Sequence, residues 1–421
     1  MAIERPKLRL HRGTTYVFDV SDSSLSSHPL KFTNDSGTSE YTTGITTSGT
    51  SGTTGATVTF AVADDAPSNL MYYCGTHGIN MGNKVRIIND PTALEFVNGG
   101  TRAFVASGTQ NPAVYNSTTG SLNASYPGIQ YFDTTTPGNA SSFGSLNAGY
   151  VNASLNNASN SWASYMAGNM SNGTRALIGG GSGYQAYTDA IQYFTCATAS
   201  NTALFGTLST SAFDKAGASD GTKALMNGGD GGNTSQIDYV TIDTLGNAQD
   251  FGDFPSSSRK ANAGFSDGVK CVWNSTNGDY EYVTAATLGN ASSFGTAVTS
   301  RQRAVTAHGN TTYGLTMGGY GYTSTWTELN VMEYVTIATP GNATDWGSTL
   351  PQNRDRAAGT GDENTAFCAG GHTDYSTYQD ADVYSNTIYA ISMTTPGNNA
   401  TDFGDLAVQH YGGAGNSGNA A

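Results

Sequence analysis

The residue types best suited to chemistry gather in one short segment, residues 72–82, which reads Tyr-Tyr-Cys-Gly-Thr-His-Gly-Ile-Asn-Met-Gly. It places Cys74, His77 and Met81 at the spacing Cys-x2-His-x3-Met, and a second imidazole, His28, lies 46 residues before the cysteine. A thiolate and two neutral imidazoles with a distant thioether are the ligand set of blue-copper sites. The sequence therefore predicts that these four residues hold one copper ion. Two alternatives stay open: zinc or an adventitious ion in the same place, and a metal-free turn beside a buried cysteine.

These four residues need a β framework to bring them together, and the flanking sequence predicts one. Alternating apolar residues indicate short strands at 7–11, 14–20, 29–32, 57–62, 70–74 and 84–88. Short strands joined by polar turns are typical of a β-sandwich, which we expect to span residues 1–91. The uncharged Gly/Ser/Thr stretch between Gly44 and Gly55 is expected to be a long loop inside this domain.

The composition of the 421-residue chain excludes several classes of partner. Its net charge is −14 with only 18 Lys and Arg residues, which disfavours nucleic acid and polybasic membrane binding. No apolar run approaches the roughly 20 residues that span a bilayer. The first ten residues lack the apolar core of a signal peptide, so we expect synthesis in the cytoplasm without export. The 54 glycines and 10% aromatic residues indicate a turn-rich but folded chain.

The other three cysteines, Cys196, Cys271 and Cys368, lie in apolar, strand-like runs. No Cys-x2-Cys pair occurs, which disfavours a zinc knuckle or a disulfide framework. We expect all three to be buried as small hydrophobic residues.

The remainder of the chain, residues 92–421, is predicted to be a repeat array. A return motif related to Tyr-Val-Thr-Ile-x-Thr-x-Gly-Asn-Ala-x-x-Phe-Gly recurs six times at irregular intervals, which is typical of propellers or solenoids. The copies span Tyr131–Gly144, Tyr193–Gly206, Tyr239–Gly252, Tyr282–Gly295, Tyr334–Gly347 and Tyr389–Gly404. Apolar strands that often end in Gly-Gly precede most copies, so each repeat offers the four strands of a propeller blade.

Six copies predict six blades, with seven as the alternative. The carboxy-terminal tail around residues 409–419 matches the inner-strand pattern, so we expect it to complete the first blade and hide its edge. In the competing assignment residues 94–98 form that inner strand, and the tail is an arm or a partial seventh blade.

Two segments resemble known families. The arrangement strand-Tyr-Tyr-Cys-x2-His-x3-Met-Gly-strand with an upstream histidine resembles the cupredoxins over residues 1 to about 90. This resemblance implies equatorial ligation by His28, Cys74 and His77 and weak axial ligation by Met81. The Gly-Gly strands and aromatic returns of residues 92–421 resemble kelch-type propellers, although the return motif departs from the standard kelch pattern.

The return motif also looks like segments of virion structural proteins from marine bacteriophages, especially cyanophages. Three short segments of the amino-terminal domain share this resemblance: Ser-His-Pro-Leu-Lys-Phe, Ser-Glu-Tyr-Thr-Thr-Gly and Tyr-Tyr-Cys-x-x-His. The resemblance implies an appendage, decoration or tail-associated role. We therefore expect a non-enzymatic virion protein, made in the host bacterial cytoplasm, with other virion proteins and a host-surface glycan or receptor as partners in an oligomeric assembly. The alternatives are a copper-binding redox protein with an appended recognition propeller, and a free glycan-binding lectin.

The histidines of the repeat array are expected to have structural roles. His308, His372 and His410 lie in different repeats without a paired acidic motif, so no catalytic set is expected. Kelch-type copper oxidases are the nearest comparison, but only His372, Tyr375 and Tyr378 approach their ligand set, and a solvated loop is the favoured interpretation.

Cations and aromatic residues recur in the loops of the array. The cations are expected to bind backbone carbonyls or turn aspartates in preference to an anionic glycan: Lys215, Arg259, Arg303 and Arg356. The aromatic residues could stack on sugars or pack against a neighbouring subunit: Tyr184, Tyr187, Tyr320, Tyr322 and Trp326.

Overall fold

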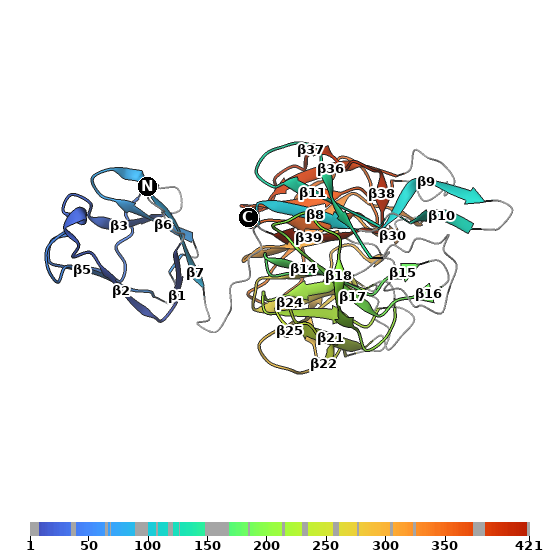
Figure 1. Cartoon of the computed structure of the whole chain (residues 1–421), viewed down its shortest axis with the longest axis horizontal. Helices are drawn as coiled ribbons and strands as arrows, with labels where there is room; N and C mark the ends of the chain where they lie inside the picture. Colours follow the sequence, from blue (N-terminus) through green and yellow to red (C-terminus); the bar gives the residue numbers. More distant parts are fainter. Residues whose placement is uncertain are drawn as a thin grey trace. The chain divides into compact units, whose positions relative to one another are not determined.

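The chain divides into two compact all-β units, Met1–Ala93 and Leu94–Ala421 (Figure 1). The sequence analysis placed this boundary two residues earlier, between residues 91 and 92. The computed structural model describes residues 8–34, 39–63, 66–67, 69–88, 100–106, 108–116, 121–125, 127–147, 168–183, 186–212, 215–229, 235–255, 261–275, 278–303, 306–322, 326–373 and 384–418. Over these ranges the one helical element is the 3-10 turn η1 (Ser23–Leu25). The all-β prediction is confirmed.

Two sheets form the amino-terminal unit. The first has the order β1-β7-β6-β3, built from Leu8–His11, Gly78–Ile88, Asn69–Cys74 and Leu30–Asn34, with β1 parallel to β7 and the other pairs antiparallel. The second has the order β2-β5-β4, built from Thr15–Asp19, Thr57–Ala61 and Ile45–Ser48. Residues of both sheets share one hydrophobic core that includes Leu10, Phe32, Val58, Phe60, Leu70 and Val85.

The expectation of one long loop between Gly44 and Gly55 is wrong. Residues Ile45–Ser48 form β4, which pairs antiparallel with Thr57–Phe60 of β5. The β-branched Ile and Thr residues favour an extended backbone, and Ile45 packs against the domain core. Only the remainder of the stretch is a turn.

The described residues of the second unit form six four-stranded antiparallel sheets and three smaller ones. The four-stranded sheets build the body of the unit. In chain order they are sheet 1 (β8 Arg102–Ala106, β11 Gly128–Asp133, β12 Ser141–Ser145, β39 Ala414–Gly418), sheet 2 (β13 Gly168–Ser171, β14 Arg175–Gly179, β17 Ala190–Thr195, β18 Ala203–Thr207), sheet 3 (β19 Gly217–Ser219, β20 Lys223–Asn227, β21 Gln236–Thr241, β22 Gln249–Asp253), sheet 4 (β23 Ala261–Ser266, β24 Lys270–Ser275, β25 Asp279–Thr284, β26 Ser292–Thr296), sheet 5 (β28 Thr306–Gly309, β29 Tyr313–Met317, β32 Val331–Thr336, β33 Thr344–Thr349) and sheet 6 (β34 Ala358–Gly361, β35 Thr365–Ala369, β36 Thr387–Ser392, β37 Thr401–Asp405).

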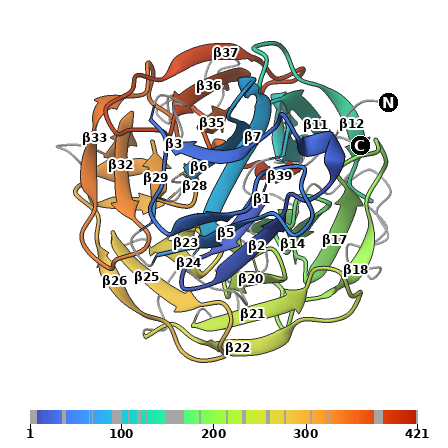
Figure 2. The same cartoon turned by 90° about the vertical axis from the view of Figure 1, so that its left-hand side faces the viewer.

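The sheets are arranged in a closed ring (Figure 2). Their inner strands touch in the cycle β39, β13, β19, β23, β28, β34 and back to β39. A separate hydrophobic cluster fills the space between each neighbouring pair of sheets, including sheets 6 and 1. The inner strand of sheet 1 comes from the carboxy-terminal tail, because β39 pairs antiparallel with β8. The competing candidate, residues 94–98, lies outside the described residues.

The return motif joins each sheet to the next. The Oδ1 of an asparagine in its turn, preceded by glycine in four copies and by Ser200 in one, accepts a hydrogen bond from a backbone N–H at the end of the preceding sheet: Asn201 from Ser145, Asn247 from Thr207, Asn290 from Asp253, Asn342 from Thr296 and Asn139 from Asp405. In sheet 6 the motif carries an extra residue, and the carbonyl of Asn398 accepts from Trp346 and Ser348 instead. These asparagines therefore have a structural role that repeats around the ring.

Extra hairpins extend from one face of the ring, which we call the loop face. They are inserted between the second and third strands of sheets 1, 2 and 5, at one end of each sheet (Figure 1). They comprise β9 (Thr109–Asn116) with β10 (Ser121–Ser125), β15 (Ser182–Gly183) with β16 (Ala186–Tyr187), and β30 (Tyr320–Tyr322) with β31 (Trp326–Glu328). Two short strands from the connections between sheets extend them: β38 (His410–Tyr411) pairs with β9, and β27 (Arg301–Arg303) pairs with β30.

The three cysteines of the ring are buried, as predicted. Burial raises the pKa of Cys196 to about 12 and that of Cys368 to about 11, so both remain thiols at neutral pH. Among the cations, Lys215 is buried and its Nζ donates to the carbonyls of Asn227 and Gly228 at 3.1 and 3.0 Å. Arg356 is also buried and binds Asp355, so neither of these cations lines an exposed rim.

Several loop residues singled out in the sequence fall outside the described parts. Tyr320 is buried and cannot be an exposed stacking platform. The remaining loop residues lie, wholly or in their side chains, beyond the described ranges: Tyr184, Tyr187, Tyr322, Trp326, Arg259, Arg303, Tyr375, Tyr378 and His410.

Candidate metal centre

A tight hairpin positions Cys74 and His77. Cys74 ends β6 and pairs with Gly78 at the start of β7, so the connecting turn contains only residues 75–77. Gly78 has φ of +71°, a left-handed conformation that glycine adopts without strain. Further along β7, a Cβ at Gly82 would lie 1.9 Å from the carbonyl oxygen of Tyr72. The glycines of the motif thus permit a close hairpin that brings the His77 ring back towards the cysteine.

His28 reaches the same edge of the sheet through β3. This strand pairs with β6 so that Leu30 lies opposite Cys74, which places His28 beside the β6–β7 turn. The N–H of Gly75 donates to the carbonyl of Pro29 at 2.8 Å and holds the two segments together. Before His28, Asp22 Oδ1 caps η1 by accepting from the Ser24 N–H, and the His28 N–H donates to the Leu25 carbonyl.

The structure brings three of the predicted ligands together. Cys74 Sγ lies 3.3 Å from His77 Nδ1 and 3.6 Å from His28 Nδ1, and the three ligand atoms all lie within 4.8 Å of one another. Metal–sulfur and metal–nitrogen bonds of about 2.3 and 2.05 Å, at angles between about 100 and 120°, separate S from N by about 3.3–3.8 Å. The observed separations are therefore those of ligands around a single ion.

The surroundings of the three atoms suit a soft metal with limited solvent access. Cys74 is buried, His28 is half-buried and His77 is exposed, so the sulfur faces the protein while one imidazole meets solvent. The two imidazole rings stack with centroids 4.6 Å apart and planes 24° from parallel, and both present Nδ1 to the sulfur. A thiolate with two imidazoles fits copper or zinc, and oxygen-preferring ions such as Mg²⁺ or Ca²⁺ fit poorly.

Met81 occupies a different kind of position from the other three residues. It is half-buried within β7, three residues beyond Gly78 and outside the turn that carries His77. Its assignment as the weak axial ligand stays a prediction.

A second group of side chains that could hold a metal ion lies in the ring, and the sequence analysis did not identify it. Glu328, Asp355 and His372 are all buried, and each offers an atom within 4.8 Å of the others. The solvated-loop interpretation of His372 is therefore wrong, because only 1% of this residue is exposed. His308, by contrast, has an ordinary structural contact: its Nε2 lies 2.9 Å from the Asp362 carbonyl, and burial lowers its pKa.

Comparison with known proteins gives no family for this chain. No family model matches it, and no curated protein matches it. In the described parts of the chain, no helix is both long enough and apolar enough to traverse a bilayer.

Proposed function

We propose that this chain is a copper-binding recognition protein that serves as a structural component of a bacteriophage particle. The observation that carries the copper assignment is the convergence of Cys74 Sγ with the Nδ1 atoms of His28 and His77. Bound copper would supply a one-electron redox centre or a rigid cross-link at this edge of the sandwich. The three residues come from two separate segments, so an ion held by them would also tie the His28 loop to the β6–β7 turn.

Titration of the purified full-length protein with Cu(II) tests the metal assignment. A thiolate-to-copper ligand set gives an intense visible absorption band, which we expect to saturate at one equivalent. The band is expected to disappear in Cys74→Ala and to shift or weaken strongly in His77→Ala. His11→Ala is the matched control, because His11 lies in β1 of the same unit and outside the cluster, and it is expected to keep the band. A folded protein that stays colourless and takes up no copper would refute the assignment.

The role in a particle is supported by the shape of the second unit and by the sequence resemblance to phage virion proteins. A closed ring of four-stranded sheets is a rigid support, and its extra hairpins are concentrated on the loop face. Loops on a rigid support are frequent sites of recognition. We assign the loop face to contact with a host-surface glycan, a receptor or another virion protein, and the amino-terminal unit to attachment within a tail, fibre or capsid decoration.

Mass spectrometry of purified particles tests this role directly. The polypeptide is expected to co-purify with intact particles through a density gradient and to be labelled on their surface by an antibody against the ring. Its absence from particles of a phage that encodes it would refute the virion assignment. The copper titration is independent of this result, because it uses the isolated protein.

A further inference from the structure

The cluster Glu328, Asp355 and His372 joins three segments of the loop face. Glu328 ends β31 in the sheet 5 hairpin, Asp355 lies in the connection from β33 to β34, and His372 follows β35 in sheet 6. The backbones of Asp355 and His372 exchange two hydrogen bonds, of 3.0 and 2.9 Å, and His372 also forms a bridge with Tyr384. The cluster is therefore built on paired backbone.

The donor atoms of the cluster lie at or close to metal-ligand separations. His372 Nδ1 is 3.3 Å from Glu328 Oε1 and 3.7 Å from Asp355 Oδ1. Bonds from zinc to nitrogen and oxygen of about 2.05 and 2.1 Å, at angles of about 100 to 120°, separate the two donors by about 3.2–3.6 Å. One imidazole and two carboxylates are a ligand set that first-row divalent ions accept.

A second group holds one of these carboxylates in place. Arg356 Nη1 donates to Asp355 Oδ2 at 2.7 Å, while Oδ1 of the same carboxylate faces His372. Ligating carboxylates are commonly oriented by such an outer hydrogen bond. Arg356 also has φ of +49°, the one left-handed non-glycine residue among those described, and strained residues of this kind concentrate at functional sites.

The charges favour an additional cation. Two carboxylates are buried here, and the adjacent Arg356 guanidinium balances one of them. Two buried carboxylates that face one imidazole are stabilised by a positive charge between them. A divalent ion supplies it, and the alternative is a protonated His372 without metal.

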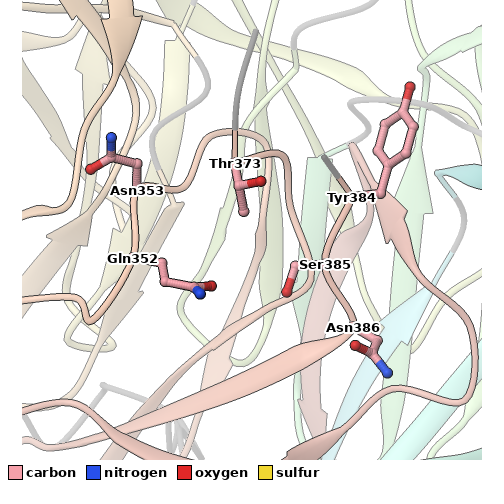
Figure 3. A pocket seen from close by; sticks show the side chains of 6 residues that line it. All are labelled: Gln352, Asn353, Thr373, Tyr384, Ser385 and Asn386. Carbon is pink, nitrogen blue, oxygen red and sulfur yellow. The ribbon is translucent and has the colours of Figure 1, made fainter. Parts of the chain in front are cut away.

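A polar cavity next to the cluster provides a route for an ion. Its volume is about 470 Å³, and its lining consists of Gln352, Asn353, Thr373, Tyr384, Ser385 and Asn386. Figure 3 shows Gln352 and Asn353 on one side and Tyr384, Ser385 and Asn386 on the other, with Thr373 between them. Thr373 directly follows His372, and the Tyr384 ring meets the His372 ring edge-on at 5.4 Å. Solvent therefore comes close to an otherwise buried ligand set.

We propose that Glu328, Asp355 and His372 form a divalent-metal site, best matched by zinc, that fastens the loop-face segments of sheets 5 and 6 to one another. The ion binds inside the ring and is separate from the copper centre of the amino-terminal unit. Its role is structural, because its bonds to the three ligands cross-link neighbouring sheets.

The test uses full-length Cys74→Ala/His77→Ala protein, in which the first cluster is removed and zinc uptake reports on the ring. After treatment with a chelator and desalting, equilibrium dialysis against Zn²⁺ with elemental analysis is expected to give one bound equivalent and a raised melting temperature. Adding Glu328→Gln or His372→Gln is expected to weaken zinc binding at least tenfold and to abolish the thermal shift.

Glu333→Gln in the same background is the matched control. Glu333 is a buried glutamate of sheet 5 that pairs with Arg301 and lies outside the cluster. We expect this variant to melt at a lower temperature but to retain the zinc equivalent. Absence of zinc uptake by the folded reference protein would overturn the proposal in favour of a protonated His372. Uptake that persists unchanged in both Glu328→Gln and His372→Gln would overturn it equally.

Discussion

The close approach between neighbouring sheets of the ring can be tested with a matched pair of glycines. Gly206 belongs to the Phe-Gly part of the return motif in sheet 2, and a Cβ there would lie 2.0 Å from the carbonyl oxygen of Gly246 in sheet 3. Gly246 is the other partner in this contact, yet a Cβ on Gly246 meets nothing within 4 Å. Neither residue has a left-handed φ, so the same Gly→Ala change tests the contact and not backbone strain.

The expected free-energy difference follows from the type of atom involved. In Gly206→Ala the new methyl group meets a backbone carbonyl that cannot rotate away, so the two sheets must separate. Overpacking of this kind costs about 3 kcal/mol. Gly246→Ala finds open space, and the reduced entropy of the unfolded chain stabilises the fold by about 0.5 kcal/mol. The two variants should therefore differ by about 3.5 kcal/mol in the free energy of unfolding.

Thermal unfolding followed by circular dichroism is a suitable assay. An unfolding entropy of about 2.1 cal/mol/K per residue over the second unit converts 1 kcal/mol into about 1.5 °C. We expect the melting transition of Gly206→Ala to lie about 5 °C below that of Gly246→Ala, with the latter at or slightly above the parent protein. Equal melting temperatures for the two variants would refute the interpretation of the return motif as the contact between sheets.

Two further predictions concern the polar groups of the ring. Asn290→Ala removes the acceptor for the Asp253 N–H. We expect it to lower the free energy of unfolding by about 1 kcal/mol, as measured by guanidinium titration. An unchanged free energy of unfolding would show that this hydrogen bond does not stabilise the closed ring. Burial lowers the pKa of Lys215 from 10.5 to about 8. Between these pH values the unfolded chain binds more protons than the folded one, so this group makes stability rise from about pH 8 to about pH 10.5. Lys215→Met should remove that rise. The measurement is the free energy of unfolding in urea of the parent protein minus that of the variant, taken at pH 7.5 and at pH 10. The same difference at both pH values would contradict the prediction.

The sequence predicted the first metal cluster because its chemistry is local. Cys74 and His77 lie on one turn, and the strand pattern before and after them indicates a hairpin. His28 is distant in sequence; the sequence identified it as a second imidazole before an apolar strand, but the pairing that brings it to Cys74 was not predicted. The Glu328, Asp355 and His372 cluster had no such signal. Its members are spread over two repeats, and they meet only because sheets 5 and 6 close against each other.

The sequence also did not predict which arginines of the ring are buried. The sequence pattern selected Arg303 and Arg356, because each precedes an apolar strand. The side chain two positions before each of them, Arg301 or Arg354, is among the largest fully buried groups of the structure. Arg301 binds Glu333 at 2.8 Å and the Gly318 carbonyl, and Arg354 donates to Gln352 and Ser385. Arg356 is buried as well, so burial of the cations in this segment depends on the strand phase at a loop, and periodicity does not fix that phase.

These observations separate the parts of the ring that maintain the fold from the parts available for recognition. The asparagines and glycines of the return motif repeat around the ring, and their contacts are accounted for by closure of the sheets. The hairpins of sheets 1, 2 and 5 differ between repeats and take no part in these return-motif contacts. A ligand that distinguishes this protein from a generic ring must meet these irregular features. Partner recognition should therefore change with substitutions on the loop face and be insensitive to stability-neutral substitutions in the return motifs, such as Gly246→Ala.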